Sequence, residues 1–533
     1  MGPGDGRPAG ARVSAEGAHG AHSAQVAQGA HGTGGLGARA RSGFVWTALA
    51  ALGGKAIGAG QFVVLGWLLS REDLGLVSMA ISSALMLSVI QYAGVTDILV
   101  SRHRRMHLWA NAGFWFALLL GTFSMALVAW AAPVVAWWQG EPWLGPMLLV
   151  MSCVVVLNSL NSVPTAVLTG ELRLRELALW QLAIQATQTV LTVGMAWWGL
   201  GAMSVVLSAA AVAPAMFVLR YRVSGLRLRA DPQWRRWRYI VSDSLVLAVV
   251  GVMNAAGDRL SPLIIGAVLG PGAVGLYFLA AQFSVQGVGL LTSNLTAVLF
   301  PTLNKMLDQP ARMLAAFDRA ARLMAAVGVM VSAGQAASAG ALVRLLLPQD
   351  KHAAAAACGL MSLGLCFGVL GSVSTALVKA TGRFGRLLWL TAGYASTGVV
   401  CIAVGGWLGD VTGAAAGYLA YSCVWGPLGA AIVSRPVGGS WRMVGGIYAP
   451  PIASAALGFG PLWLASLWLP VGVWWDILRI LTFASVGVVA YLAALSRLHG
   501  GTYRDLITQA AGPLRRLGPL GRSAGAALGR LGP

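Results

Sequence analysis

The stretch Leu69-Ser-Arg-Glu-Asp-Leu-Gly-Leu76 returns 200 positions later as Leu269-Gly-Pro-Gly-Ala-Val-Gly-Leu276. Each copy follows one long apolar segment and opens the next. A second echo, Ser162-Val-Pro-Thr-Ala166, returns as Ser372-Val-Ser-Thr-Ala376 at a spacing of 210 positions. Two echoes in the same order indicate that the chain contains an internal duplication. Duplicated bundles with a site between the halves are the usual architecture of secondary transporters.

The composition places both copies in a membrane. Of 533 residues, 57% are hydrophobic and only 10% are charged, and the mean hydropathy is +0.72. The apolar runs do not alternate with period two, so they predict helices of about 20 residues and not a barrel. We therefore expect an all-α polytopic membrane protein with about fourteen spans. The spans are expected to begin near Phe44, Leu74, Leu108, Pro146, Leu177, Met203, Ile240, Val274, Ala315, Ala353, Leu387, Val411, Val444 and Trp474.

The net charge of +20 is distributed as a topology signal. Alternate turns are rich in arginine, above all the linker from Arg220 to Arg238, whereas the opposite turns carry little beyond Arg71, Arg344 and Lys351. The positive-inside rule then predicts that both termini are cytoplasmic. Anionic membrane lipids, and not nucleic acid, are the partners that this charge predicts.

The order of the spans divides the chain into two lobes, a linker between them and three flanking segments. Six spans in each lobe mean that both lobes enter the membrane from the same side, as parallel repeats with a cavity between them. The first segment lacks the apolar run of a signal peptide and is expected to be disordered. The expected units are a cytoplasmic tail (1–41), an N-lobe (42–221), a basic linker (222–238), a C-lobe (239–435), two extra spans (436–498) and a basic cytoplasmic tail (499–533).

Charged residues inside predicted spans are candidates for function. Lys55 lies near the middle of the first span, where a lysine costs roughly 2.5 to 3.5 kcal/mol to insert, and Asp258 and Arg259 lie within the seventh. Lys55 and Arg259 could face a wet central cavity and attract an anionic group. Alternatively, Arg259 pairs with an acid on a neighbouring helix and locks its bundle. Asp258 points about 100° away from Arg259 and is a coupling or structural charge.

The fifth span carries a stripe of amides at helical spacing, formed by Gln181, Gln185 and Gln188. Amides can bind sugar hydroxyls, but they also cross-link helices, and both roles stay open. Gln61 on the first span could extend such a polar lining.

Sequence patterns of enzymes and metal sites are missing from the chain. There is no HExxH, GxSxG or Walker A pattern, and the five cysteines are scattered through predicted spans. We therefore expect no metal, no cofactor and no enzymatic activity, so that energy comes from gradients or the membrane potential.

At these residues the chain resembles the polysaccharide transporters of the oligosaccharide flippase family (Wzx-type). This family belongs to the MOP exporter superfamily, with the MATE multidrug exporters and the lipid II flippases. The likeness covers about residues 42–435. It is carried by Ser42-Gly-Phe-Val-Trp46, the two echoes, Gly257-Asp-Arg-Leu-Ser-Pro-Leu-Ile-Ile-Gly266 and Phe300-Pro-Thr-Leu303.

The resemblance implies flipping of an undecaprenyl-pyrophosphate-linked repeat unit across the bacterial inner membrane, by alternating access, for exopolysaccharide, capsule or O-antigen. A polysaccharide polymerase or export machinery is then a candidate partner. A MATE-like cation-coupled drug exporter is the first alternative, but cavities for cationic drugs favour buried acids, whereas the deepest charge here is Lys55. A membrane polysaccharide polymerase or ligase would need a large catalytic outer loop, which the sequence does not offer.

Overall fold

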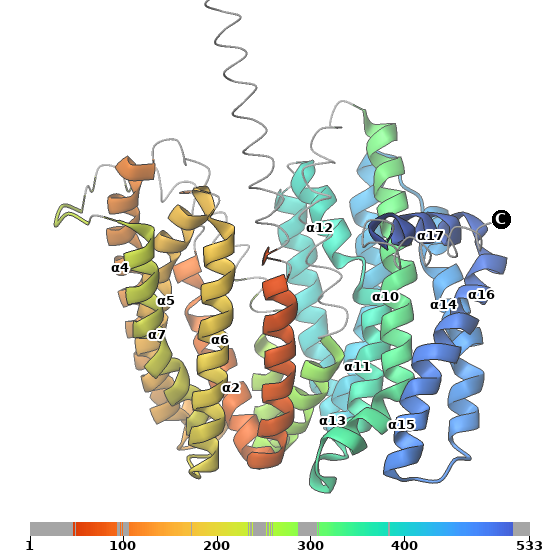
Figure 1. Ribbon diagram of the computed structural model, residues 1–533, viewed down its shortest axis with the longest axis horizontal. Helices are drawn as coiled ribbons and strands as arrows, with labels where there is room; N and C mark the ends of the chain where they lie inside the picture. Colours follow the sequence, from red (N-terminus) through yellow and green to blue (C-terminus); the bar gives the residue numbers. More distant parts are fainter. Residues whose placement is uncertain are drawn as a thin grey trace, which may run out of the picture.

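The computed structural model describes residues 46–47, 49–92, 96, 99, 106–171, 173–226, 228–232, 234, 237, 252, 255, 257, 259–285, 306, 309–381 and 384–514. Within these residues the regular structure is entirely helical. Figure 1 shows two bundles side by side, with the first span, Leu49–Leu68, standing between them.

The N-terminal bundle consists of α2 (Arg71–Leu87), α4 (Met106–Gln139), α5 (Leu144–Gly170), α6 (Leu174–Trp197) and α7 (Met203–Ser224). The C-terminal bundle includes the short helices Arg259–Leu269 and Pro271–Val285. It continues with α10 (Pro310–Leu346), α11 (Ala354–Gly368), α12 (Gly371–Ala380) and α13 (Phe384–Ser434). Outside it stand α14 (Trp441–Ser466), α15 (Val473–Thr482), α16 (Val488–Leu498) and α17 (Gly500–Leu514).

The prediction of an all-α polytopic membrane protein is confirmed. Nine helices within the described ranges are long and apolar enough to cross a membrane. The longest, α13, breaks at Gly409 and Asp410, where Asp410 takes a φ of +54°, so it provides the two spans expected near Leu387 and Val411. The span expected to begin near Ile240 lies mostly outside the described residues.

The repeated sequence around Ser70 is a helix start. The Ser70 hydroxyl accepts a hydrogen bond from the backbone N–H of Asp73 at 3.0 Å, and the Asp73 carboxylate accepts one from the backbone N–H of Ser70 at 3.2 Å. This capping box satisfies two open N–H groups at the start of α2. Asp73 also accepts a hydrogen bond from the N–H of Ala202 at 3.1 Å, which ties α2 to the turn between α6 and α7.

The two copies of the repeat meet each other at equivalent positions. A Cβ atom on Gly75 would collide with the carbonyl oxygen of Pro271, and one on Gly275 would collide with the carbonyl oxygen of Arg71. Pro271 is the repeat equivalent of Arg71, as Gly275 is of Gly75, so the contact is reciprocal. We call these four residues the glycine crossing. It joins the two pseudo-symmetric lobes backbone to backbone, with a core cluster from both lobes around it.

The two ends of the bundles differ in their side chains. At one end, the bottom of Figure 1, lie the ends of α4, α6 and α14, the break in α13 and the start of α15. Exposed tryptophans occur at these helix ends, namely Trp137, Trp198, Trp407, Trp468 and Trp474, as is typical of a membrane interface. We call this end the tryptophan end, and the glycine crossing lies there. The other end, the basic end, holds the start of α10 and the crosswise helix α17.

Candidate functional site

Lys55 lies on the side of the first span that faces the C-terminal bundle. Seven residues on, or two helical turns, Phe62 packs edge to face on Phe278 with ring centroids 5.5 Å apart. Eleven residues on, or three turns, Gly66 lies against Leu347 at the end of α10. Residues at these spacings share a helix face, so the half-buried Lys55 lies on the face turned toward the C-terminal bundle.

Arg259 occupies the corresponding face of its own helix. Seven residues after it, Gly266 lies against Met79 of α2 and Gln139 of α4. The Gln139 amide also donates a hydrogen bond to the carbonyl oxygen of Leu263 at 3.0 Å. This face is therefore the one turned toward the N-terminal bundle. The first-span cation thus lies on a face that contacts the C-terminal bundle, and the seventh-span cation on a face that contacts the N-terminal bundle.

Neither cation has a hydrogen-bond or ion-pair partner among the residues that the structure describes. Within that part of the chain, Arg259 does not form the locking ion pair that the sequence left open. Asp258 lies outside the described residues. By the repeat spacing of 200, Arg259 corresponds to Ala59, which is one helical turn from Lys55. The two positions are therefore offset by about 6 Å along the helix axes.

Gln61 has a different role from Lys55. Its side-chain oxygen accepts a hydrogen bond from the hydroxyl of Thr189 on α6 at 2.9 Å, and Gly53 lies against Leu182 of the same helix. These contacts hold the first span against α6. Gln61 lies about 120° around the helix from Lys55, so it does not line the wall that carries Lys55.

The amide stripe on α6 runs along the contact with α7. Arg220 of α7 donates a hydrogen bond to the Gln181 side-chain oxygen at 2.5 Å, and Thr192 and Ser208 share one at 2.6 Å. These two positions cross-link helices. Gln185 and Gln188 lie between them, half-buried and without a side-chain hydrogen bond among the described residues.

Three cations that the sequence analysis had assigned to turns make specific contacts within the protein, and two of them, Arg220 and Lys351, are buried. Arg220, expected in the basic linker, is buried within α7 and also donates a hydrogen bond to the Thr165 hydroxyl at 3.2 Å. Lys351 is only 3% exposed, and its ammonium group donates a hydrogen bond to the carbonyl oxygen of Gly66 at 2.6 Å. Arg344 forms a two-pronged ion pair with Asp476. The sequence does not distinguish a charged residue in the last turn of a helix from one in the loop that follows, because it does not locate the helix end to within a turn.

Comparison with known proteins identifies the lineage of this fold. A model of the family described as "Polysaccharide biosynthesis protein" matches residues 64–354, which is more than half of the chain and includes the glycine crossing. The chain belongs to this family.

Two relatives are similar in sequence to this family member. The succinoglycan biosynthesis transport protein ExoT of Rhizobium meliloti (strain 1021) is 26% identical over 377 residues, which are 67% of this chain and 72% of ExoT. The lipopolysaccharide biosynthesis protein WzxC of Escherichia coli (strain K12) is 23% identical over 300 residues, which are 54% of this chain and 58% of WzxC.

Solved structures share its fold at low sequence identity. The lipid II flippase MurJ, in an inward closed conformation, aligns with a TM-score of 0.70 at 12% identity, covering 87% of this chain and all of MurJ. An inward-facing MATE multidrug transporter of the MOP superfamily aligns with a TM-score of 0.58 at 13% identity, covering 73% of this chain and 98% of the transporter. The predicted membership of a polysaccharide biosynthesis family is confirmed, and so is a fold shared with the lipid II flippase MurJ and a MATE transporter.

Proposed function

We propose that this protein is a flippase for a lipid-linked oligosaccharide, the precursor of an exopolysaccharide, capsule or O-antigen. The proposal includes alternating access between the lobes, without a covalent step. Its proposed substrate class is a polyprenyl-pyrophosphate-linked repeat unit. The names of ExoT and WzxC, which refer to succinoglycan transport and to lipopolysaccharide biosynthesis, support a role in the export of a polysaccharide precursor. A polysaccharide polymerase or export machinery would use the product.

One observation supports the proposal: Lys55 and Arg259 each lie two helical turns, on the same helix face, from a contact with the opposite lobe. We therefore place these two cations on facing walls of the substrate path between the lobes. Two cations offset by about one turn suit a group with two phosphates, because each can donate charge-assisted hydrogen bonds to a different phosphate. Gln185 and Gln188 are the candidates for hydroxyl groups of the sugar. A cationic drug would be repelled by the same two walls, which disfavours the MATE-like alternative.

The proposed orientation puts the basic end in the cytoplasm, with both termini, and the tryptophan end outside the bacterial inner membrane. The clustering of arginines at the basic end supports it, through the positive-inside rule. In this orientation the glycine crossing closes the outer side. An inside-negative potential would then favour outward movement of the pyrophosphate, by roughly 2.3 kcal/mol per charge per 100 mV.

The proposal is tested by transport in proteoliposomes. Lys55→Ala should slow the movement of lipid-linked oligosaccharide about tenfold to a hundredfold, because a hydrogen bond to a charged group is worth about 1.5 to 3 kcal/mol. Lys55→Arg should keep part of the rate. Arg312→Ala removes an equal charge from an exposed position at the basic end and serves as the control.

Folding of each variant is checked by its melting temperature. Lys55→Ala at the wild-type rate would remove Lys55 from the site. A wild-type protein that moved no lipid-linked oligosaccharide would refute the function itself.

A further inference from the structure

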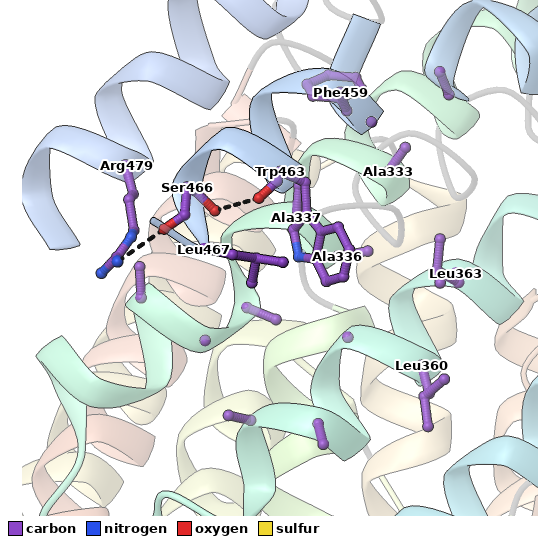
Figure 2. Close-up of a pocket in the computed structure, with 18 of the residues that line it drawn as sticks. Ala333, Ala336, Ala337, Leu360, Leu363, Phe459, Trp463, Ser466, Leu467 and Arg479 are labelled. Atoms are coloured by element: carbon purple, nitrogen blue, oxygen red, sulfur yellow. Dashed lines mark hydrogen bonds between the residues drawn. The ribbon is translucent and has the colours of Figure 1, made fainter. Parts of the chain in front are cut away.

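The C-terminal bundle carries an apolar groove on its outer side, toward the tryptophan end. The groove has a volume of about 740 Å³ and is bounded by α10, α11 and α14. Figure 2 shows small side chains of α10, including Ala336 and Ala337, opposite Leu360 of α11 and Trp463 of α14. Because alanines and glycines recur on this face of α10, the neighbouring helices leave an open channel.

The charged residues of the groove lining are two arginines at the tryptophan end, held by one acid. Asp476, 3% exposed, accepts hydrogen bonds from Arg344 at 2.6 and 3.0 Å and from Arg479 at 2.7 Å. Arg479 also donates to the carbonyl oxygens of Ser466 and Leu469, so both of its terminal nitrogens are used. Two cations and one anion leave this end of the groove with a charge of +1.

Arg344 keeps one donor for a ligand. Its Nε and Nη2 atoms bind Asp476, while Nη1 has no hydrogen-bond partner within the described ranges. Nη1 lies beside Gly340, 3.2 Å from the position of a Cβ atom there, and Gly340 lines the groove. The side chain of Arg344 is 29% exposed. The guanidinium group therefore presents a free N–H edge at the head of an apolar channel.

The length of the groove fits a lipid chain. Its lining on α10 extends from Val329 to Arg344, which are 15 residues apart and thus about 22 Å along the helix. Half of a bilayer's hydrocarbon core is about 15 Å thick. A chain that starts beside Arg344 therefore stays in the groove until it passes the midplane.

We propose that this groove is a binding site for an anionic phospholipid, with its phosphate on Arg344 Nη1 and one acyl chain along α10. The occupant comes from the leaflet at the tryptophan end. It is not the transported substrate, because the groove contains none of the residues on the facing walls between the lobes. Its α14 wall and Arg479 lie beyond the duplicated part of the chain, so the lipid would fix the two additional spans to the C-terminal bundle.

Native mass spectrometry of delipidated protein tests the proposal. With phosphatidylglycerol and phosphatidylcholine of identical chains at equal concentration, we expect one phosphatidylglycerol retained, with about tenfold preference. Both phosphates can accept the hydrogen bond from Arg344, but the choline cation of phosphatidylcholine is repelled by the net positive charge at this end of the groove. Arg344→Gln should abolish this preference. Ala336→Phe fills the groove without touching the ion pair with Asp476, and it should abolish retention of the lipid.

The matched control is Val190→Phe, which adds the same ring at a position on α6 that is 70% exposed, and it should leave retention unchanged. Equal retention of the two phospholipids by the wild-type protein would overturn the proposal, and so would retention by Ala336→Phe. Polyprenyl phosphate that displaced phosphatidylglycerol from the wild-type protein would also overturn it, because the groove would then belong to the substrate. None of these results depends on whether the protein transports an oligosaccharide.

Discussion

Removal of the Lys351 ammonium group should weaken the contact between the end of the first span and the turn between α10 and α11. We call this contact, at the tryptophan end, the closed junction. Lys351 bonds the carbonyl oxygen of Gly66, one of the carbonyls at the end of the first span that have no partner within the helix. The indole N–H of Trp67 also donates to the carbonyl oxygen of Leu346 at 2.8 Å. Three features therefore attach the end of the first span to the α10–α11 turn: these two hydrogen bonds and the packing of Leu347 on Gly66.

The change Lys351→Met keeps an unbranched side chain and removes the charge and the donor. A hydrogen bond from a charged group contributes about 1.5 to 3 kcal/mol to stability. The variant loses this contribution, but it also avoids the desolvation cost of burying an ammonium group, which offsets part of the loss. We expect the closed junction to lose about 1 to 2 kcal/mol relative to the open one. The open fraction should therefore rise roughly 5- to 30-fold.

The assay is the rate at which a maleimide labels Val274→Cys in a cysteine-free background. Val274 is fully buried beside the glycine crossing, so the labelling rate is proportional to the open fraction. Asp350→Asn is the control, because its carboxylate is 54% exposed and lies 3.5 Å from the Lys351 ammonium group. An exposed pair of this kind contributes little. Unchanged labelling in a folded Lys351→Met protein, or an equal effect of Asp350→Asn, would refute the reasoning.

Three further predictions concern the lobe contact, the topology and the C-terminal helix. Gly75→Ala should prevent the backbone contact with Pro271 and lower the melting temperature by several degrees, measured against Gly54→Ala, which meets open space. Arg229→Cys should resist an impermeant thiol reagent in intact cells and react after the membrane is disrupted, as a cytoplasmic position must. The hydrogen bond from Arg319 holds the pKa of Asp505 below its ordinary value. This contact therefore persists at neutral pH and is lost on acidification below about pH 4. In the wild-type protein, hydrogen exchange of the α17 amides should lose protection below that pH. In Asp505→Asn, the same loss of protection should already be present at about pH 7.

The sequence was sufficient for the fold because spans and repeats are linear patterns. Apolar length predicts a span, and the echo of Gly75 in Gly275 predicts equivalent places in two lobes. The sequence could not predict that these glycines contact the opposite repeat, because a linear pattern does not specify which surfaces of the two lobes meet. The face of Lys55 became known only through the contacts of Phe62 and Gly66, which belong to distant segments.

The sequence also could not predict which polar side chains are used in contacts between helices. Gln181 and Gln185 look alike in the sequence, yet only Gln181 is near enough to Arg220 to be used as a cross-link. The groove beside α10 could not be predicted either. Its alanines also suit close helix packing, and only the position of α14 leaves the space unfilled.

The glycine crossing has the symmetry of an isologous dimer interface contained within one chain. In such an interface a residue i contacts residue j of the partner, and j contacts i, which is the relation of position 75 to position 271 and of 275 to 71. A half-length ancestor pairing with a second copy of itself would have needed only one glycine to form both contacts. In the present chain the two glycines are separate positions that meet in space, so loss of either glycine breaks one side of a contact whose other side survives.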